Sequence, residues 1–324
     1  MLCLCATLLW NCGGKSDAGS PKPPVNGVYY WRTTYKTDSV ENAFLHNNQI
    51  KRMYVRFFDV DVDNSISGEK YLPVATIQLD DTLPADVEII PTVFISNKAI
   101  EHYNDFYKFL AHRIYAMCDN FGIEPSEVQF DCDWTSSTQK TYFYFLKKIG
   151  TELNNYFFEM QISATIRLHQ LSQTPPPVDN GVLMCYNTGN FKTFGTQNSI
   201  LDINDVEPYM KHLKKYKLPL SIALPAYSWN IEFDDKKEFL RLNREQYNFG
   251  DTNIKAVGKN TYEMEMPGES RIYIRHEEVS AETLKNVKQL ILKHMSYKPD
   301  IILYHLDSKQ IEKYSKDEIS EIYR

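Results

Sequence analysis

Eight short apolar runs alternate with amphipathic stretches along most of this 324-residue chain, and this alternation restricts the possible folds more than any other feature. The runs lie at residues 27–32, 51–61, 88–95, 128–134, 159–167, 181–187, 218–225 and 299–305. Between them, apolar residues with helical spacing are clearest at 103–121. Strands that alternate with helices favour a parallel sheet. Eight such units in one chain predict an α/β fold, a (β/α)8 TIM barrel.

The N-terminal residues are typical of a targeting segment rather than of the barrel. Residues 1–12 are an apolar run ending at Cys12, and residues 13–26 are rich in Pro, Gly and Ser. This pattern resembles a bacterial lipoprotein signal with Cys12 as the lipidated residue, followed by a flexible tether. The alternatives are an ordinary cleaved secretory signal or a disordered tail. We therefore expect a cell-envelope protein anchored through lipid to the outer membrane or cell surface.

Residues 27–324 are predicted to form a single barrel domain with an insertion at about 230–277. We expect this insertion to hold a short helix and then a hairpin of residues 260–266 and 271–276. A turn is expected at residues 64–68, with a hairpin strand at 72–79. The sequence leaves the oligomeric state open.

Charge and cysteine content narrow the function. The formal net charge of −6 argues against a nucleic-acid partner. Outside the N-terminal segment the cysteines are Cys118, Cys132 and Cys185, an odd number without metal-type spacing. We expect three buried thiols, although one disulfide is possible. No Gly-rich phosphate loop or Ser-His-Asp signature stands out, so no cofactor and no metal are expected.

The fourth run ends in two carboxylates, Asp131 and Asp133. Because side chains alternate along a strand, these two face one way, while Phe130, Cys132 and Trp134 face the other. Two like charges so close are costly in a core. The pair therefore indicates either a functional site or a solvated strand end.

The carboxyl ends of the predicted strands supply acidic, aromatic and polar side chains together. They are Trp31 and Arg32; Arg56 and Asp59; Asp131, Asp133 and Trp134; Arg167 and His169; Tyr186 and Asn187; Tyr227 and Trp229; and His305 and Asp307. In a barrel these ends meet at one face. Aromatic rings with carboxylates suit a sugar, so we predict a carbohydrate ligand. The alternative is an ordinary rim without a shared ligand.

The order of these motifs resembles glycoside hydrolase family 18, the chitinases and endo-β-N-acetylglucosaminidases. That family's fourth strand ends in Asp-x-Asp-x-Glu, often Phe-Asp-x-Asp-Trp-Glu, and here the sequence is Phe130-Asp131-Cys132-Asp133-Trp134-Thr135. Its Met-x-Tyr-Asp motif matches Met184-Cys185-Tyr186-Asn187, and its Leu-Pro-x-Tyr-Gly motif matches Leu224-Pro225-Ala226-Tyr227-Ser228. The resemblance covers residues 27–310.

The resemblance implies a substrate-assisted mechanism in which the motif's Glu is the acid and the substrate's N-acetyl group attacks the anomeric carbon. Here Thr135 stands at the Glu position, and a hydroxyl is too weak an acid for that step. Asp133 and Tyr186 match the residues that orient the N-acetyl group. The implied catalytic residues are Asp131, Asp133 and Tyr186. The implied substrate-binding residues are Trp31, Arg56, Asp59, Trp134, Asn187, Tyr227, Trp229, His305 and Asp307.

Three interpretations stay open at this point. The first is a glycoside hydrolase-like protein, acting on an N-acetylhexosamine-containing glycan with a non-standard acid. That acid would be Asp131 or Asp133 with a raised pKa, or Asp59, Asp307 or His305. The second is an inactive glycan-binding barrel with aromatic platforms. The third is a metal-dependent hydrolase using Asp131, Asp133, His169 and His305, a set that lacks a His-x-His run.

Overall fold

A computed structural model describes residues 23–63, 70–103, 105–195, 197–244, 246–266, 268 and 270–324. Cys12, the signal at 1–12, most of the tether and the turn at 64–68 lie outside these residues. In the described part of the chain, no helix is both long and apolar enough to cross a membrane.

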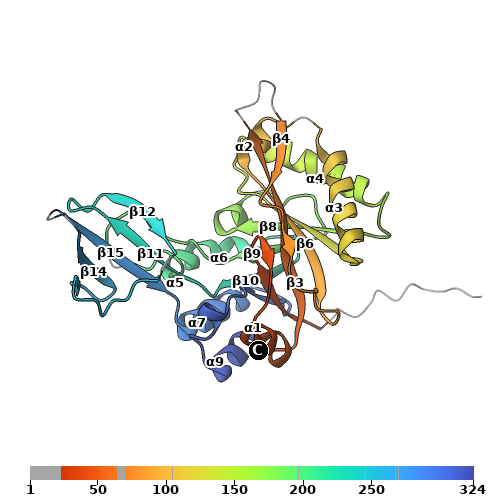
Figure 1. Cartoon of the computed structure of the whole chain (residues 1–324). Coiled ribbons are helices and arrows are strands. Elements are labelled where there is room, and N and C mark those ends of the chain that lie inside the picture. The colour runs from red at the N-terminus through yellow and green to blue at the C-terminus, as the bar shows by residue number, and fades with distance from the viewer. Residues whose placement is uncertain are drawn as a thin grey trace, which may run out of the picture.

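Eight parallel strands close into a barrel, as the alternation predicts (Figure 1). They are β1 (Asn26–Tyr30), β3 (Ile50–Asp63), β6 (Glu88–Ile95), β7 (Glu127–Asp131), β8 (Gln161–Arg167), β9 (Asn180–Met184), β10 (Leu220–Pro225) and β16 (Ile301–Tyr304). Strand β1 pairs in parallel with both β16 and β3, which closes the ring. The expected (β/α)8 fold is therefore confirmed.

Short strands extend the barrel on one side. Strand β4 (Lys70–Val74) pairs antiparallel with β3 beyond the barrel, and β2 (Thr34–Tyr35) pairs with β5 (Gln78–Leu79). The expected single strand at 72–79 is thus two strands, β4 and β5, with different partners.

Helices cover the outside of the barrel. They are α1 (Ser39–Asn47), α2 (Asn97–Glu101), α3 (Tyr107–Phe121), α4 (Gln139–Leu153), η1 (Leu168–Ser172), α5 (Ile203–Val206), η2 (Glu207–Tyr209), α6 (Met210–Leu213), α7 (Ala281–Leu292), α8 (Ser308–Ile311) and α9 (Lys316–Tyr323). Helix α3 buries Leu110, Ile114 and Cys118 against the strands, and it ends at Gly122, whose φ of 65° suits glycine. The helical segment formed by α5, η2 and α6 is divided into three short pieces, since Pro208 in η2 lacks the N–H that a continuous helix needs.

The segment between β10 and α7 forms a separate five-stranded antiparallel sheet, which we call the lobe. Its strands are β11 (Ser228–Phe233), β12 (Phe239–Asn243), β13 (Ile254–Ala256), β14 (Thr261–Glu265) and β15 (Arg271–Glu278), in the order β12-β11-β15-β14-β13. The lobe projects to the left of the barrel in Figure 1. The hairpin of β14 and β15 agrees with expectation. The expected short helix is wrong, because β11 and β12 occupy its place.

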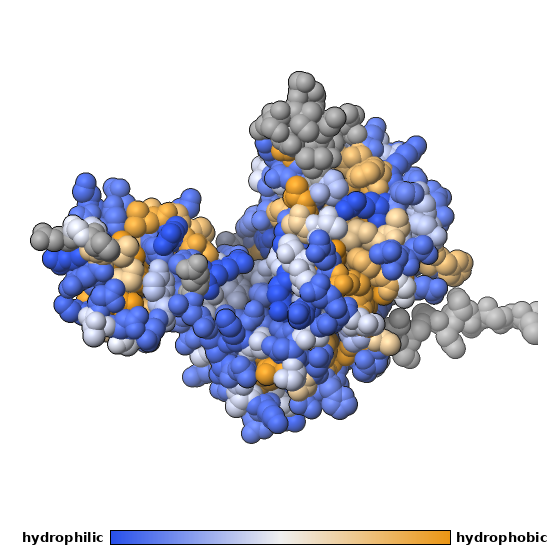
Figure 2. All heavy atoms as spheres, in the orientation of Figure 1, coloured by the Kyte–Doolittle hydropathy of each residue, from blue (hydrophilic) through white to orange (hydrophobic). Residues whose placement is uncertain are grey.

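Buried side chains hold the barrel interior in register. The Tyr29 hydroxyl donates to Gln129 Oε1 at 2.7 Å, and Gln129 Nε2 lies 3.4 Å from Ser163 Oγ, so hydrogen bonds link three strands inside the barrel. Cys118, Cys132 and Cys185 are free and buried, as expected. The face of the molecule in Figure 2 is mostly hydrophilic, with apolar patches on the lobe and beside the helices.

Candidate functional site

The mouth of the barrel is formed where the eight strands reach their carboxyl ends. At the end of β7, Asp131 and Asp133 both contact Arg167 and therefore face the same way. Phe130 faces outward to α4, where its ring centroid lies 5.3 Å from that of Phe145. The alternation expected from the sequence thus holds through this strand end.

One guanidinium links the two carboxylates. Arg167, the last residue of β8, places Nη2 3.2 Å from Asp131 Oδ1, and its Nε donates a hydrogen bond to Asp133 Oδ1. Thr165 on the same strand donates its hydroxyl to Asp131 Oδ1 at 2.6 Å. Asp131 is 5% exposed, whereas the Asp133 side chain is 57% exposed. Asp131 is therefore a buried anchor for Arg167, and Asp133 presents a carboxylate to the mouth.

Burial controls the protonation of Asp131. It raises the pKa of the Asp131 carboxyl, the nearby Arg167 guanidinium opposes that rise, and the Asp133 charge adds to it. The two carboxylates in turn raise the pKa of Arg167 against the effect of its own burial, so the arginine stays charged. Asp131 thus binds a proton more tightly than an ordinary aspartate, and Arg167 remains the cation of the site.

Thr135 lies in the turn that leads into α4. Its hydroxyl is 2.7 Å from the Ser137 hydroxyl, and its backbone N–H donates to Thr138 Oγ1 at 2.9 Å. The side chain is exposed. The structure therefore places a cluster of hydroxyl groups, none of them an effective acid near neutral pH, next to Asp133.

Aromatic rings line the opposite side of the mouth around Tyr304, the last residue of β16. Tyr186 stacks on Tyr304 with ring centroids 4.9 Å apart, and Trp31 and Tyr227 lie 5.8 and 5.9 Å from it. The Arg56 guanidinium lies 5.7 Å from the Trp31 ring centroid. We call Trp31, Tyr186, Tyr227 and Tyr304 the aromatic wall. Trp31 and Tyr304 are half-buried and present the accessible ring surface, whereas Tyr186 and Tyr227 are buried and support them from behind.

Hydrogen bonds and ion pairs order the polar residues near this wall. Tyr227 donates its hydroxyl to Asn187 Oδ1 at 2.7 Å. Asn187 has a φ of 55°, which an asparagine tolerates better than most residues, and it is exposed. Arg56 forms an ion pair with Asp59, with Nε 2.7 Å from Oδ1. These predicted residues do gather at the mouth.

Two predicted platforms do not face the mouth, and their assignment as substrate-binding residues is corrected. Trp134 is fully buried at 0% exposure, because its ring points outward against Phe143 of α4 at 5.4 Å. Trp229 is 5% exposed, and its Nε1 donates to Glu277 Oε2 at 2.8 Å beneath the lobe. Neither indole can stack on a ligand in this structure, because protein covers both rings.

Two hollows flank the mouth. One, of about 650 Å³, lies beside Trp31 and Arg56 and is lined by the ion pair of Arg32 with Glu41, whose atoms approach to 2.8 Å. The other, of about 400 Å³, lies between β16 and the lobe. His305 and Asp307 both line this second hollow, so the predicted ligand residues of the eighth strand are at its wall rather than beside Asp133.

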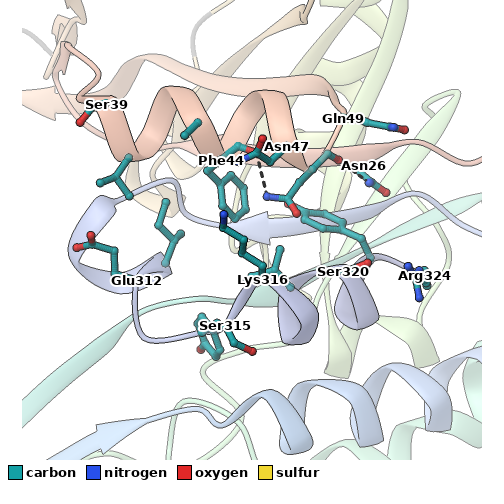
Figure 3. Close-up of a pocket in the computed structure, with 17 residues that line it drawn as sticks. Asn26, Ser39, Phe44, Asn47, Gln49, Glu312, Ser315, Lys316, Ser320 and Arg324 are labelled. Carbon is teal, nitrogen blue, oxygen red and sulfur yellow. Dashed lines mark hydrogen bonds between the residues drawn. The ribbon is translucent and has the colours of Figure 1, made fainter.

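A larger hollow of about 860 Å³ lies away from the carboxyl ends of the strands, along α1 and α9 (Figure 3). Its walls include Phe44 of α1 and Lys316 of α9, and it reaches Asn26 and Gln49 at the amino ends of β1 and β3. This groove lacks the paired carboxylates and stacked rings of the mouth. We therefore place the candidate site at the mouth.

Three residues are more prominent in the structure than the sequence predicted. Arg167 was expected only as one of the strand-end residues, and Tyr304 and Arg244 were not expected at the site. Arg167 ends β8, the strand next to the one that ends at Asp131, and this position in the sequence indicates that the two side chains can meet. Tyr304 precedes His305 at the end of the eighth apolar run, and this position also indicates a side chain at the mouth. Arg244 comes from the loop after β12, where no motif marks it. Among the residues that the structure describes, no three His, Cys, Asp or Glu side chains come together so that they could hold a metal ion.

Comparisons with known proteins agree on the fold. No protein-family model matches the chain, and neither does any curated protein. Solved structures do match. The chitinase from Chromobacterium violaceum has a TM-score of 0.55 at 10% identity, covering 93% of this chain and 98% of that one. The Bacillus cereus spore cortex-lytic enzyme SleL has a TM-score of 0.53 at 14% identity, covering 94% and 76%.

A third similar structure is a plant class V chitinase mutant from Cycas revoluta in complex with (GlcNAc)3, with a TM-score of 0.53 at 8% identity, covering 93% and 100%. At these identities the likeness concerns the fold alone. The chain therefore has the (β/α)8 barrel seen in chitinases and other glycoside hydrolases.

Proposed function

We propose that this protein binds an N-acetylhexosamine-containing glycan at the mouth of its barrel and does not cleave it by the route of family 18. The observation that carries the proposal is the single guanidinium of Arg167 shared by Asp131 and Asp133, opposite an aromatic wall. A site that retains its ordered polar groups and rings, but has Thr135 where the proton donor is expected, is suited to holding a sugar.

The chemistry of the mouth supports a sugar ligand. Ring faces pack against the C–H face of a pyranose, while carboxylates and amides accept bonds from its hydroxyls. Asp133 is more than half exposed and Asn187 is exposed, so both are available for such bonds. The similar plant chitinase was solved with a GlcNAc trimer bound, which is why N-acetylglucosamine is the sugar we propose.

Thr135 argues against catalysis by the route of family 18. Cleavage of a glycosidic bond requires a proton on the leaving oxygen, and the resemblance assigns that proton to a Glu at this position. The Thr135 hydroxyl instead lies in a cluster with Ser137 and Thr138. A hydroxyl does not give up a proton near neutral pH, so the standard step has no acid here.

One observation favours hydrolysis as a second candidate function. Burial raises the pKa of Asp131, so this carboxyl could hold the proton that the leaving oxygen needs. In that reaction the Asp131 proton goes to the glycosidic oxygen, the bond from that oxygen to the anomeric carbon breaks, and the substrate's N-acetyl oxygen bonds to the same carbon. Water then opens the resulting ring and returns a proton to Asp131. The 5% exposure of Asp131 weighs against this role.

The experiment is calorimetric titration with (GlcNAc)4, with chromatography of the same mixtures for shorter products. We expect wild type to bind without forming products, and Asp133→Asn and Tyr186→Phe to bind more weakly. Absence of binding would overturn the proposal. Products that disappear in Asp131→Asn would establish the second candidate instead. Thr135→Glu restores a carboxyl group at the acid position, so any hydrolysis gained in that variant would support the loss of the acid as the cause of inactivity.

We also propose that Cys12 carries a lipid anchor that holds the barrel at the cell envelope. The support is the apolar run before Cys12 and the Gly- and Pro-rich segment after it. Metabolic labelling with an alkyne fatty acid in a bacterial host tests it. We expect label in the full chain and none in Cys12→Ala. Equal labelling of both would refute the anchor at this residue.

A further inference from the structure

The hollow between β16 and the lobe has a chemistry different from that of the mouth. It is lined by Tyr227, Ser228, Arg244, Gln246, Tyr304, His305, Asp307, Lys309 and Gln310, and it measures about 400 Å³. Tyr227 and Tyr304 belong both to this hollow and to the aromatic wall. A chain of sugars resting on the wall can therefore extend into the hollow, which we call the lobe pocket.

Arg244 differs from the other arginines around the mouth. Arg32 pairs with Glu41, Arg56 pairs with Asp59, and Arg167 pairs with two aspartates. Within the described parts of the chain, Arg244 forms no ion pair and no hydrogen bond. Burial raises the pKa values of Tyr227 and Tyr304, and the charge of Arg244 opposes that rise. It therefore presents an uncompensated guanidinium to the lobe pocket.

A second cation lies on the same pocket wall. Lys309 also has no ion-pair partner among the described residues. Asp307 is the negatively charged residue of the pocket wall, and its charge helps to raise the pKa of Arg32. Burial lowers the pKa of His305 to about 4, so its ring is neutral at physiological pH. Among the described residues, the pocket wall thus holds more positive than negative charge.

Two residues of the pocket wall also carry buried polar atoms that lack partners. In the described structure, His305 Nδ1 and Asp307 Oδ1 are buried without a hydrogen bond. A buried polar atom left unpaired is costly, so the wall around His305 and Asp307 has hydrogen-bonding capacity that this structure does not use. A neutral imidazole and a carboxylate oxygen are suitable partners for sugar hydroxyls.

We propose that the lobe pocket is a subsite for a sugar that carries a carboxylate, with Arg244 as its main charge partner and Lys309 as a second. The planar guanidinium matches a carboxylate with two parallel hydrogen bonds. The proposal rests on the proposed function, because it extends the same glycan from the aromatic wall into the pocket. It names the substrate class as an acidic N-acetylhexosamine-containing glycan.

The test compares two probes that differ by one group. They are the disaccharide GlcNAc-MurNAc and its neutral counterpart (GlcNAc)2, which lacks only the lactyl ether with its carboxylate. We expect wild type to bind the acidic probe about tenfold or more tightly, the usual effect of a hydrogen-bonded charge pair. Because Arg244 is exposed, this preference should shrink in 0.5 M salt.

Matched variants assign the preference to the pocket. In Arg244→Gln the ratio of the two dissociation constants should fall to about three or less, and Lys309→Gln should reduce it partly. Arg271→Gln, which removes an equal charge from β15 in the same lobe, should keep the wild-type ratio, since Arg271 pairs with Glu263 outside the pocket. Circular dichroism on each variant checks that it is folded.

The outcomes separate this inference from the proposed function. Binding of both probes with equal affinity by wild type overturns the acidic subsite and leaves glycan binding intact. A preference that persists in Arg244→Gln also overturns it. If neither probe nor (GlcNAc)4 binds, the subsite and the proposed function both fail. Hyaluronan oligosaccharides, whose carboxylate belongs to a uronic acid, show which kind of acidic sugar the pocket prefers.

Discussion

Arg167 and Asp131 meet across the boundary between two neighbouring strands, with Nη2 of the arginine 3.2 Å from Oδ1 of the aspartate. The aspartate is buried, so removal of the arginine leaves an uncompensated charge that water cannot reach. Because the same guanidinium also holds Asp133, this contact links the stability of the barrel to the shape of the proposed binding site.

Arg167→Met should therefore lower the free energy of unfolding by about 3–5 kcal/mol, the usual cost of breaking a buried pair from one side. Urea denaturation followed by circular dichroism measures it. Arg271→Gln, an exposed arginine in the lobe, is the control and should change stability by less than about 1 kcal/mol. Equal stability of Arg167→Met and wild type would show that the contact is not a net stabilising one. Affinity for (GlcNAc)4 should also fall in Arg167→Met, since Asp133 loses its orientation.

The buried carboxyl of Asp131 predicts a specific pH dependence. Burial raises its pKa in the folded state above the ordinary value of 3.8, so the folded state holds this proton more tightly than the unfolded state. The contribution of Asp131 to stability is complete below pH 3.8 and is lost as the pH rises through the raised pKa. The Asp131→Asn variant has no carboxyl group at this position, so its stability should not show this decrease with rising pH. Relative to wild type, the variant should gain stability with rising pH across this window, by up to about 1.4 kcal/mol per pH unit. A difference that stays flat with pH would contradict the prediction.

Substitutions of Trp31 and Trp134 should affect glycan affinity differently, because only Trp31 has an accessible ring. Trp31 contributes to the aromatic wall, so Trp31→Ala should weaken (GlcNAc)4 binding by about two- to tenfold, the range expected for loss of one ring contact. Trp134→Phe should leave the affinity within a factor of about two, because the Trp134 ring packs against Phe143 away from the mouth. Calorimetric titration of both variants decides. An equal loss of affinity in both would contradict the burial of Trp134.

The sequence predicted the barrel because parallel strands and their covering helices produce strong, repeated patterns. It also predicted that Asp131 and Asp133 share one side, since that follows from strand geometry alone. The same alternation put Trp134 on the opposite side. Its assignment as a platform relied on its place at a strand end. In the structure Trp134 is buried on the outer side of the strand, as the alternation of side chains requires.

Other features depend on contacts that no local pattern encodes. The shared guanidinium of Arg167 requires the register of two neighbouring strands. Arg244 lies beside the end of β16 because the lobe is positioned there, and no local sequence pattern encodes that position. The error in the lobe was different in kind. Apolar and polar residues alternate through β11, from Trp229 to Phe233, and this two-residue period already favoured a strand over the expected helix.

The lobe should depend on one buried ion pair. Arg275 Nε lies 2.7 Å from Glu277 Oε1, and both side chains are almost fully buried. Arg275 also donates to the carbonyl of Thr193, while Glu277 accepts from Ser199 and Trp229, so the pair fastens the loop after β9 to the lobe. Glu277→Gln removes the negative charge and leaves Arg275 buried without it, which should cost about 3–5 kcal/mol.

Hydrogen exchange should accelerate in residues 191–195 and 197–199 and in β15, and remain slow in β6 and β7. Glu265→Gln, which breaks only the exposed pair with Lys255, should cost less than about 1 kcal/mol and leave exchange unchanged. Faster exchange across the whole barrel in Glu277→Gln would instead mean that the lobe and barrel unfold as one cooperative unit.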